Sequence, residues 1–167
     1  MPVTPITLKL ICFAIFFVLQ TLDVSAQPTV IVVRHGEKRD STTDTLLSPQ
    51  GEARAARLAN MLAMSNVRAI YTTQYKRTIL LAAPTAQRLA LKPVSIPAKE
   101  TSLLLDRIRA HAKDEVVLVV GHSNTLPEIL KGLGHASVVT VREDEFDNLF
   151  IVALQTGGAP AVLHLKY

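Results

Sequence analysis

Two stretches decide the fold: residues 30–37 read VIVVRHGE, and residues 116–124 read VVLVVGHSN. Each is a continuous apolar run of strand length that ends in a polar cluster containing a histidine next to a glycine. Such runs are typical of parallel strands that are buried on both faces of a sheet. Because ligands of open α/β sheets lie at the carboxyl ends of the strands, we expect the two clusters to face one crevice.

Helical patterns alternate with strand-like runs along the rest of the chain. Weaker strand patterns occur at 69–73 and 94–96. Ser48 followed by Pro49 predicts a helix N-terminus, and Gly51 is expected to let that helix approach a neighbouring element closely. Further helices are expected at 76–91, 102–112 and 125–133, the last of them ended by Gly134. This alternation predicts a three-layer α/β/α sandwich.

The tail of the chain has a different pattern. Apolar runs at 138–141 and 149–154 are followed by the turn sequence TGGAP and by a further run at 161–166. A short Gly-rich connection cannot join parallel strands, so it predicts a hairpin with an antiparallel strand at a sheet edge. The predicted sheet is therefore mixed and mostly parallel.

The first 26 residues read as an export signal. Lys9 precedes the apolar run 10–19, and Val24-Ser25-Ala26 resembles a cleavage site. We therefore expect residues 1–26 to be a signal peptide that is removed before Gln27, with residues 27–167 forming one catalytic domain. The alternative is a retained N-terminal anchor, although ten apolar residues are too few to span a bilayer. The expected location is the periplasm or the exterior, with no stable membrane span after cleavage.

Composition excludes several classes of protein. A chain of 167 residues with 49% apolar and 19% charged residues is expected to fold as one domain rather than to be disordered. The net charge is +4, but the basic residues are scattered and no aromatic residues interleave with them, so nucleic acid is not an expected partner. No His-x-His or His-Glu-x-x-His pair occurs, so neither a metal nor another cofactor is expected.

A third polar cluster points to the ligand. Residues 71–78 read YTTQYKRT, follow a predicted strand and open a helix, which brings Arg77 toward the edge that holds Arg34, His35 and His122. Guanidinium groups bind phosphate oxygens through two parallel hydrogen bonds, and the amides of a helix N-terminus add partial positive charge. The sequence therefore predicts a phosphate site.

Four segments of the chain resemble motifs of the histidine phosphatase superfamily, which includes the phosphoglycerate mutases and the histidine acid phosphatases. They are residues 34–37 (RHGE), 47–51 (LSPQG), 77–78 (RT) and 121–122 (GH), and the resemblance covers about residues 29 to 154. It implies a metal-independent phosphomonoesterase that works through a phosphohistidine intermediate.

The resemblance also implies roles for individual residues. His35 would attack phosphorus, while Arg34, Arg77 and His122 would hold the phosphoryl oxygens. Gly36 lets the backbone approach the phosphate, and Asn124 would add a donor. The residues themselves support the role of His35, because nearby arginines disfavour the imidazolium form and keep the ring nucleophilic.

The leaving group also needs a proton. By order along the chain, the resemblance makes Glu100 the candidate acid, with a carboxyl pKa raised by desolvation. Glu37, Asp40 and Asp44 are the competing acids. The acid phosphatase branch places an acid directly after its second histidine, where this chain has Ser123. That difference favours the mutase-like branch.

Departures from the mutase pattern favour hydrolysis over transfer. The mutases carry a Trp-Asn pair where this chain reads KRDS at 38–41, and the chain has no Trp. Long loops that exclude water are missing, so we expect an exposed site that accepts a small phosphorylated substrate or one attached to the envelope. The alternatives are a phosphate-binding or sensor module without turnover, and a phosphoglycerate mutase-type phosphotransferase. The sequence indicates neither the substrate nor the oligomeric state.

Overall fold

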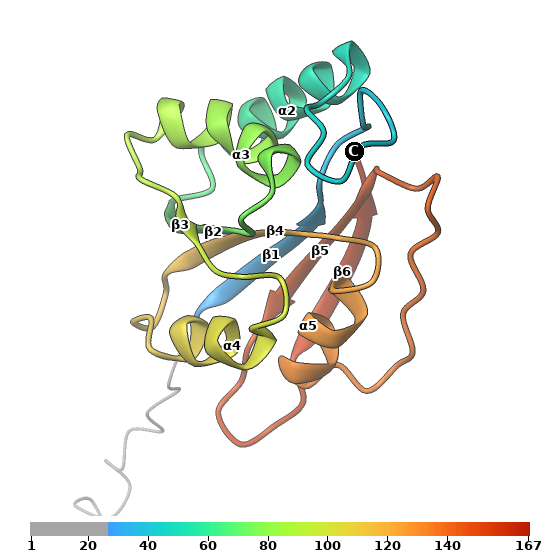
Figure 1. Cartoon of the computed structure of the whole chain (residues 1–167). Coiled ribbons are helices and arrows are strands. Elements are labelled where there is room, and N and C mark those ends of the chain that lie inside the picture. Colours follow the sequence, from blue (N-terminus) through green and yellow to red (C-terminus); the bar gives the residue numbers. More distant parts are fainter. Residues whose placement is uncertain (1–26) are drawn as a thin grey trace, which may run out of the picture.

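The computed structural model describes residues 27–167, so the predicted signal peptide at residues 1–26 lies outside the described residues. One six-stranded sheet in the order β3-β2-β4-β1-β5-β6 lies between two layers of helices (Figure 1). The predicted three-layer α/β/α architecture is confirmed. In chain order the elements are β1 (Thr29–Arg34), α2 (Pro49–Met61), β2 (Val67–Thr72), α3 (Lys76–Arg88), β3 (Val94–Ser95), α4 (Thr101–Arg109), β4 (Val116–Gly121), α5 (Leu126–Gly132), β5 (Asn148–Ala153) and β6 (Ala161–Lys166).

Strand β1 lies inside the sheet and explains the continuous apolar run of the sequence. It pairs in parallel with β4 and antiparallel with β5. Its side chains alternate between two cores: Val30 and Val32 pack with residues of α4 and α5, whereas Ile31 and Val33 pack with residues of α2 and α3. Each face of the sheet is therefore covered, as the apolar runs predict.

The C-terminal hairpin makes the sheet mixed. Strands β5 and β6 pair antiparallel along their whole length, and β6 lies at one edge of the sheet. The apolar run at 138–141, in contrast, is not a strand. Val141 instead packs into the core, while Val138 is 95% exposed. The loop from residue 134 to residue 147, which we call the 134–147 loop, contains this run.

The start of α2 fixes the chain just after β1. Ser48 caps the helix by accepting a hydrogen bond from the Gly51 amide at 3.2 Å. A Cβ on Gly51 would lie 2.5 Å from the carbonyl oxygen of Glu37, so this position has room only for glycine. The predicted close approach is confirmed, and it holds residues 35–37 against the helix at the carboxyl end of β1.

Candidate active site

The two histidine clusters meet at the carboxyl ends of β1 and β4. Arg34 is the register partner of Gly121, and the His35 amide donates to the Gly121 carbonyl at 3.0 Å. The ring centroids of His35 and His122 lie 5.2 Å apart with an interplanar angle of 62°. The expectation that these clusters share one edge of the sheet is therefore met by the pairing of β1 with β4.

The imidazole of His35 is held as a neutral ring with one free nitrogen. Its Nδ1 lies 2.7 Å from the carbonyl oxygen of Gly36, which can only accept, so Nδ1 carries the proton and donates. Nε2 is then left with its lone pair. His35 is 3% exposed, and burial lowers its pKa to about 3. The hydrogen bond to Gly36 opposes this shift in pKa, while His122 and the two arginines add smaller contributions to it. The arginines were expected to keep the ring neutral, but burial is the larger cause.

His122 is also held as a neutral ring, by partners on both nitrogens. Its Nδ1 accepts from Nη2 of Arg77 at 3.2 Å, since a guanidinium can only donate. Nε2 therefore carries the proton and donates to Oγ1 of Thr73 at 2.9 Å. Burial and, to a smaller extent, the charges of Arg77 and Arg34 together lower the pKa of His122 to about 4.

Two threonines complete this arrangement, and the sequence analysis gave neither of them a role. Thr73 Oγ1 lies 3.0 Å from Thr78 Oγ1, which in turn donates to the Tyr75 carbonyl at 2.8 Å. Thr73 then donates to Thr78, because the single hydroxyl hydrogen of Thr78 is used on the Tyr75 carbonyl. Both threonines are buried at the start of α3. The hydrogen bonds from His122 to Thr73 and from Thr73 to Thr78 fix the tautomer and orientation of the His122 ring.

Arg34 is buried and Arg77 is partly buried, and each keeps an unpaired nitrogen. Arg34 is 1% exposed and donates through Nη1 to the carbonyls of Arg142 and Glu145 at 2.7 and 3.0 Å. Arg77 donates through Nη1 to the carbonyl of Thr43 at 2.8 Å. The Nε atoms of both arginines are buried, and within residues 27–167 neither has a hydrogen-bond partner. Unsatisfied cationic donors beside two neutral histidines fit an anion with several oxygen atoms.

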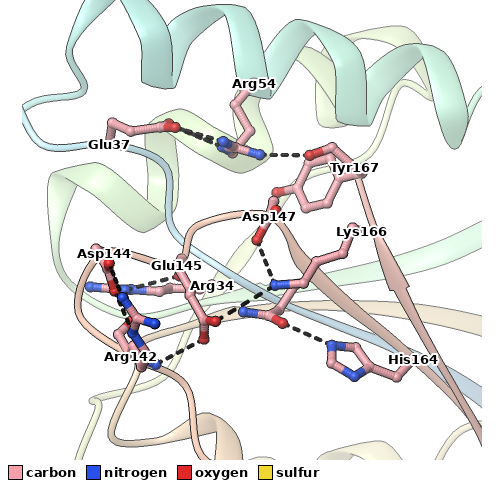
Figure 2. A network of polar contacts seen from close by, with 11 residues as sticks. Arg34, Glu37, Arg54, Arg142, Asp144, Glu145, Asp147, His164, Lys166 and Tyr167 are labelled. Carbon is pink, nitrogen blue, oxygen red and sulfur yellow. Dashed lines mark hydrogen bonds and ion pairs between the residues drawn. The ribbon is translucent and has the colours of Figure 1, made fainter.

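The 134–147 loop adds two side chains that the sequence analysis did not identify. Glu143 Oε2 accepts from Nη2 of Arg34 at 2.8 Å, and its Oε1 accepts from the Ser123 hydroxyl at 2.5 Å. The Phe146 ring lies over the Arg34 guanidinium, 4.2 Å from its central carbon, and 5.9 Å from the ring of His35. Figure 2 shows Arg34 beside Arg142 and Glu145 of the same loop. The site was expected to be exposed, but this loop covers it.

Glu100, the predicted acid, lies apart from these contacts. It precedes α4 as its N-cap residue, and its exposed side chain makes no capping hydrogen bond to the described part of the chain. It lines a hollow together with Thr73 and Tyr71. The burial that the prediction requires is not present in this structure, so a proton-donating role for Glu100 stays a prediction.

The competing acids are held by other partners. Arg54 donates to both carboxylate oxygens of Glu37, and Figure 2 shows this pair beside Tyr167. Burial raises the pKa of Glu37, but the hydrogen bonds to its carboxylate and the charges of Arg54 and Arg57 together outweigh burial and leave the pKa below its ordinary value. Asp40 accepts from the Thr42 amide, and Asp44 accepts from the Lys76 amide.

The remaining predicted residues lie close to the two histidines in the chain. Gly36 is buried, and a Cβ on it would lie 3.1 Å from the backbone of Gly51. Asn124 is exposed, two residues after His122. Among residues 27–167, no three His, Cys, Asp or Glu side chains are grouped so that they could hold a metal ion.

Comparisons with known proteins agree with this geometry. The sequence profile described as "Histidine phosphatase superfamily (branch 1)" matches residues 30–99, which include three of the four motifs but not the segment around His122. The fold supplies that fourth segment, because β4 places it beside β1. No curated protein matches the chain by sequence.

Solved structures share the fold at low sequence identity. The protein histidine phosphatase SixA, complexed with tungstate, is 16% identical with a TM-score of 0.66; the match covers 83% of this chain and 96% of that one. A mycobacterial glucosyl-3-phosphoglycerate phosphatase is 12% identical with a TM-score of 0.65, over 83% and 97%. Phosphoserine phosphatase from Entamoeba histolytica is 16% identical with a TM-score of 0.62, over 84% and 98%. By the profile match over residues 30–99 and by its fold, the chain is similar to the histidine phosphatase superfamily (branch 1).

Proposed function

We propose that the protein is a metal-independent phosphomonoesterase that hydrolyses its substrate through a phosphohistidine intermediate on His35. The observation that carries the proposal is the tautomer of His35. Its Nδ1–H donates to the Gly36 carbonyl, so Nε2 is free to act as the nucleophile without prior loss of a proton. Its low pKa keeps the ring unprotonated at neutral pH.

The reaction proceeds in two displacements at phosphorus. In the first, Nε2 of His35 forms a bond to phosphorus while the ester oxygen leaves and takes up a proton. In the second, water attacks the phosphohistidine, and the P–N bond breaks to release inorganic phosphate. Arg34, Arg77 and His122 stabilise the charge on the phosphoryl oxygens in both steps. The unpaired Nε atoms of the two arginines supply donors for this purpose.

Protonation of the leaving oxygen is assigned to Glu100. The assignment rests on the family resemblance and on the position of Glu100 at the start of α4, beside Thr73 in one hollow. An exposed carboxyl is a weak acid catalyst at neutral pH unless bound substrate covers it. The proposal therefore includes partial burial of Glu100 by the leaving group.

The proposed substrate is a phosphate monoester outside the cytoplasm. The predicted signal peptide supports a periplasmic or secreted location, and within residues 27–167 no helix combines the length and apolar character needed to cross a bilayer. The three similar structures act on a phosphoprotein, a sugar phosphoglycerate and an amino-acid phosphate, by their names. Envelope glycolipid phosphate and phosphoprotein are the substrate classes to screen first.

Trapping of the intermediate tests this function. The protein is incubated with an aryl phosphate that carries a radiolabelled phosphoryl group and is then denatured without acid. We expect the label to be bound to the wild-type protein and absent from His35→Ala. His135→Ala is the matched control, because His135 lies outside the site and is expected to leave labelling intact. Activity that survives EDTA supports the metal-independent mechanism, while equal labelling of His35→Ala would refute the role of His35.

A phosphate-binding module without turnover is the second candidate, and one observation favours it. Arg34 and His35 are 1% and 3% exposed, so a bound phosphate could be retained rather than turned over. The same protein samples discriminate the two functions. Phosphate binding without hydrolysis of an aryl phosphate, whose good leaving group needs little acid catalysis, would establish the binding module.

A further inference from the structure

The side chain of Glu143 lies against the groups that are proposed to hold phosphate. Its carboxylate bridges Arg34 Nη2 and the Ser123 hydroxyl, at 2.8 and 2.5 Å. Ser123 directly follows His122, so the bridge joins the ends of β1 and β4 across the site. A carboxylate and a phosphoryl group present similar oxygen acceptors to a guanidinium.

The contact with Glu143 uses one of the two nitrogens, Nε and Nη2, that Arg34 has left for binding an anion. Both Nη1 hydrogens are used by the carbonyls of Arg142 and Glu145. The opposite edge, formed by Nε and Nη2, is the edge that binds an oxyanion through two parallel bonds. Arg54 uses that same edge to bind Glu37. In Arg34, Nη2 is bound to Glu143, and Nε has no partner within residues 27–167.

The charge of Glu143 acts on the three groups that are proposed to hold phosphate, Arg34, Arg77 and His122, which we call the phosphate cradle. Its negative charge raises the pKa of Arg77 and of His122, although burial outweighs it and leaves both below their ordinary values. The hydrogen bond from Ser123 and the charge of Arg34 lower the pKa of Glu143 itself, so the carboxylate is ionised at neutral pH. An anion therefore already occupies the neighbourhood of Arg34, Arg77 and His122.

Glu143 can be displaced at low cost. Its side chain is 78% exposed, whereas that of Arg34 is 1% exposed. The 134–147 loop has no helix or strand, and its residue Val138 is 95% exposed. Displacing Glu143 therefore breaks two hydrogen bonds, but the Glu143 side chain is not packed in the core.

From this geometry we infer that Glu143 is an intramolecular competitor of phosphate, which occupies a phosphoryl-oxygen position on Arg34 until the substrate displaces it. The inference rests on the proposed function, because it assumes that Arg34 binds the phosphoryl group. It makes Glu143 a residue that sets substrate affinity: loss of its charge strengthens phosphate binding. If Glu143 instead oriented Arg34 for catalysis, loss of its charge would weaken phosphate binding, so the two roles predict opposite signs.

Phosphate affinity of three variants tests the inference. Binding of inorganic phosphate is measured by calorimetry on the wild type, Glu143→Gln, Glu143→Ala and the control Asp144→Asn. Asp144 is the adjacent carboxylate, pairs with Arg142 at the surface and controls for loss of one negative charge in the same loop. We expect phosphate to bind Glu143→Gln roughly fivefold more tightly, the upper end for an ion pair with one exposed partner. Asp144→Asn should stay within about twofold of the wild type.

The outcomes separate this inference from the proposed function. Equal or weaker phosphate binding by both Glu143 variants, or equal tightening by Asp144→Asn, would overturn the competitor role. A selective loss of activity toward poor leaving groups in Glu143→Gln, with unchanged phosphate affinity, would make Glu143 the acid and would also overturn it. Labelling of His35 does not depend on Glu143, so the proposed function survives either result and fails only in the trapping experiment.

Discussion

Lowering the pH from 7 to 5 should destabilise the fold through the two buried histidines of the site. His35 and His122 are 3% and 6% exposed, and burial lowers their pKa values from 6.5 to about 3 and about 4. In the unfolded chain both rings titrate near 6.5. Between these limits the unfolded state binds protons that the folded state does not, so the free energy of unfolding falls as the pH falls.

The size of the effect follows from the two shifts. At pH 5 an unfolded histidine is almost fully protonated, while both buried rings are still neutral. At about 1.4 kcal/mol per pH unit below the unfolded pKa, each histidine lowers the free energy of unfolding by about 2 kcal/mol between pH 7 and pH 5. Carboxylates with lowered pKa values, such as Glu37, contribute mainly at more acidic pH, so this window isolates the histidines.

Urea unfolding at pH 7, 6 and 5 measures the effect. The wild type is compared with His35→Gln and His122→Gln, which cannot take up a proton, and with His135→Gln as the control outside the site. Each site variant should lose about 2 kcal/mol of the pH dependence, whatever its stability at pH 7. Variants that keep the full wild-type pH dependence would refute the claim that these rings are neutral because they are buried.

Three further predictions concern single side chains. Glu100→Gln should lower kcat for alkyl phosphates far more than for aryl phosphates, because an aryl oxide leaves with little help from an acid. Equal losses in kcat for both would show that Glu100 is not the acid. Gly51→Ala should lower the free energy of unfolding by roughly 1 to 3 kcal/mol, measured by thermal unfolding, because the added Cβ meets the Glu37 carbonyl. The better helix propensity of alanine does not offset this. Gln50→Ala, at an exposed position of the same helix, is the control and should be near neutral. Thr73→Val should lower kcat/KM roughly tenfold by leaving the His122 Nε2–H unpaired, with activity rescued by Thr73→Ser. Thr85→Val is its control, a buried threonine whose hydroxyl has no partner in residues 27–167.

The sheet and the meeting of the two histidines could be predicted from local patterns. The runs at 30–33 and 116–120 are apolar at every position because both faces of β1 and β4 are buried. A parallel pair then brings both carboxyl ends to one edge, which places His35 next to His122. The run at 138–141 gives a similar local signal but is a loop, with Val141 packed in the core and Val138 exposed. Local composition does not report whether a short apolar run pairs with a strand or packs on the core as a loop.

The covering of the site could not be predicted in this way. Glu143 and Phe146 belong to a charged segment, REDEF at 142–146, that follows no motif and reads as solvated surface. Their contacts with Arg34 and His35 arise only when the 134–147 loop returns across the ends of β1 and β4. Thr73 was part of a quoted cluster, but its role depends on which nitrogen of His122 is protonated. That information exists only in the three-dimensional arrangement.

The burial of Arg34 and its contact with Glu143 should favour hydrolysis of phosphate monoesters over diesters. Arg34 is 1% exposed and its free edge is shared with Glu143, so an incoming group must outcompete one carboxylate charge. A phosphate monoester carries up to two negative charges at neutral pH, whereas a diester carries one and presents fewer free oxygens to the arginines. We therefore expect an aryl monophosphate to be hydrolysed much faster than the bis-aryl phosphate. Comparable kcat/KM values for the two esters would show that Arg34 and Arg77 do not select by charge.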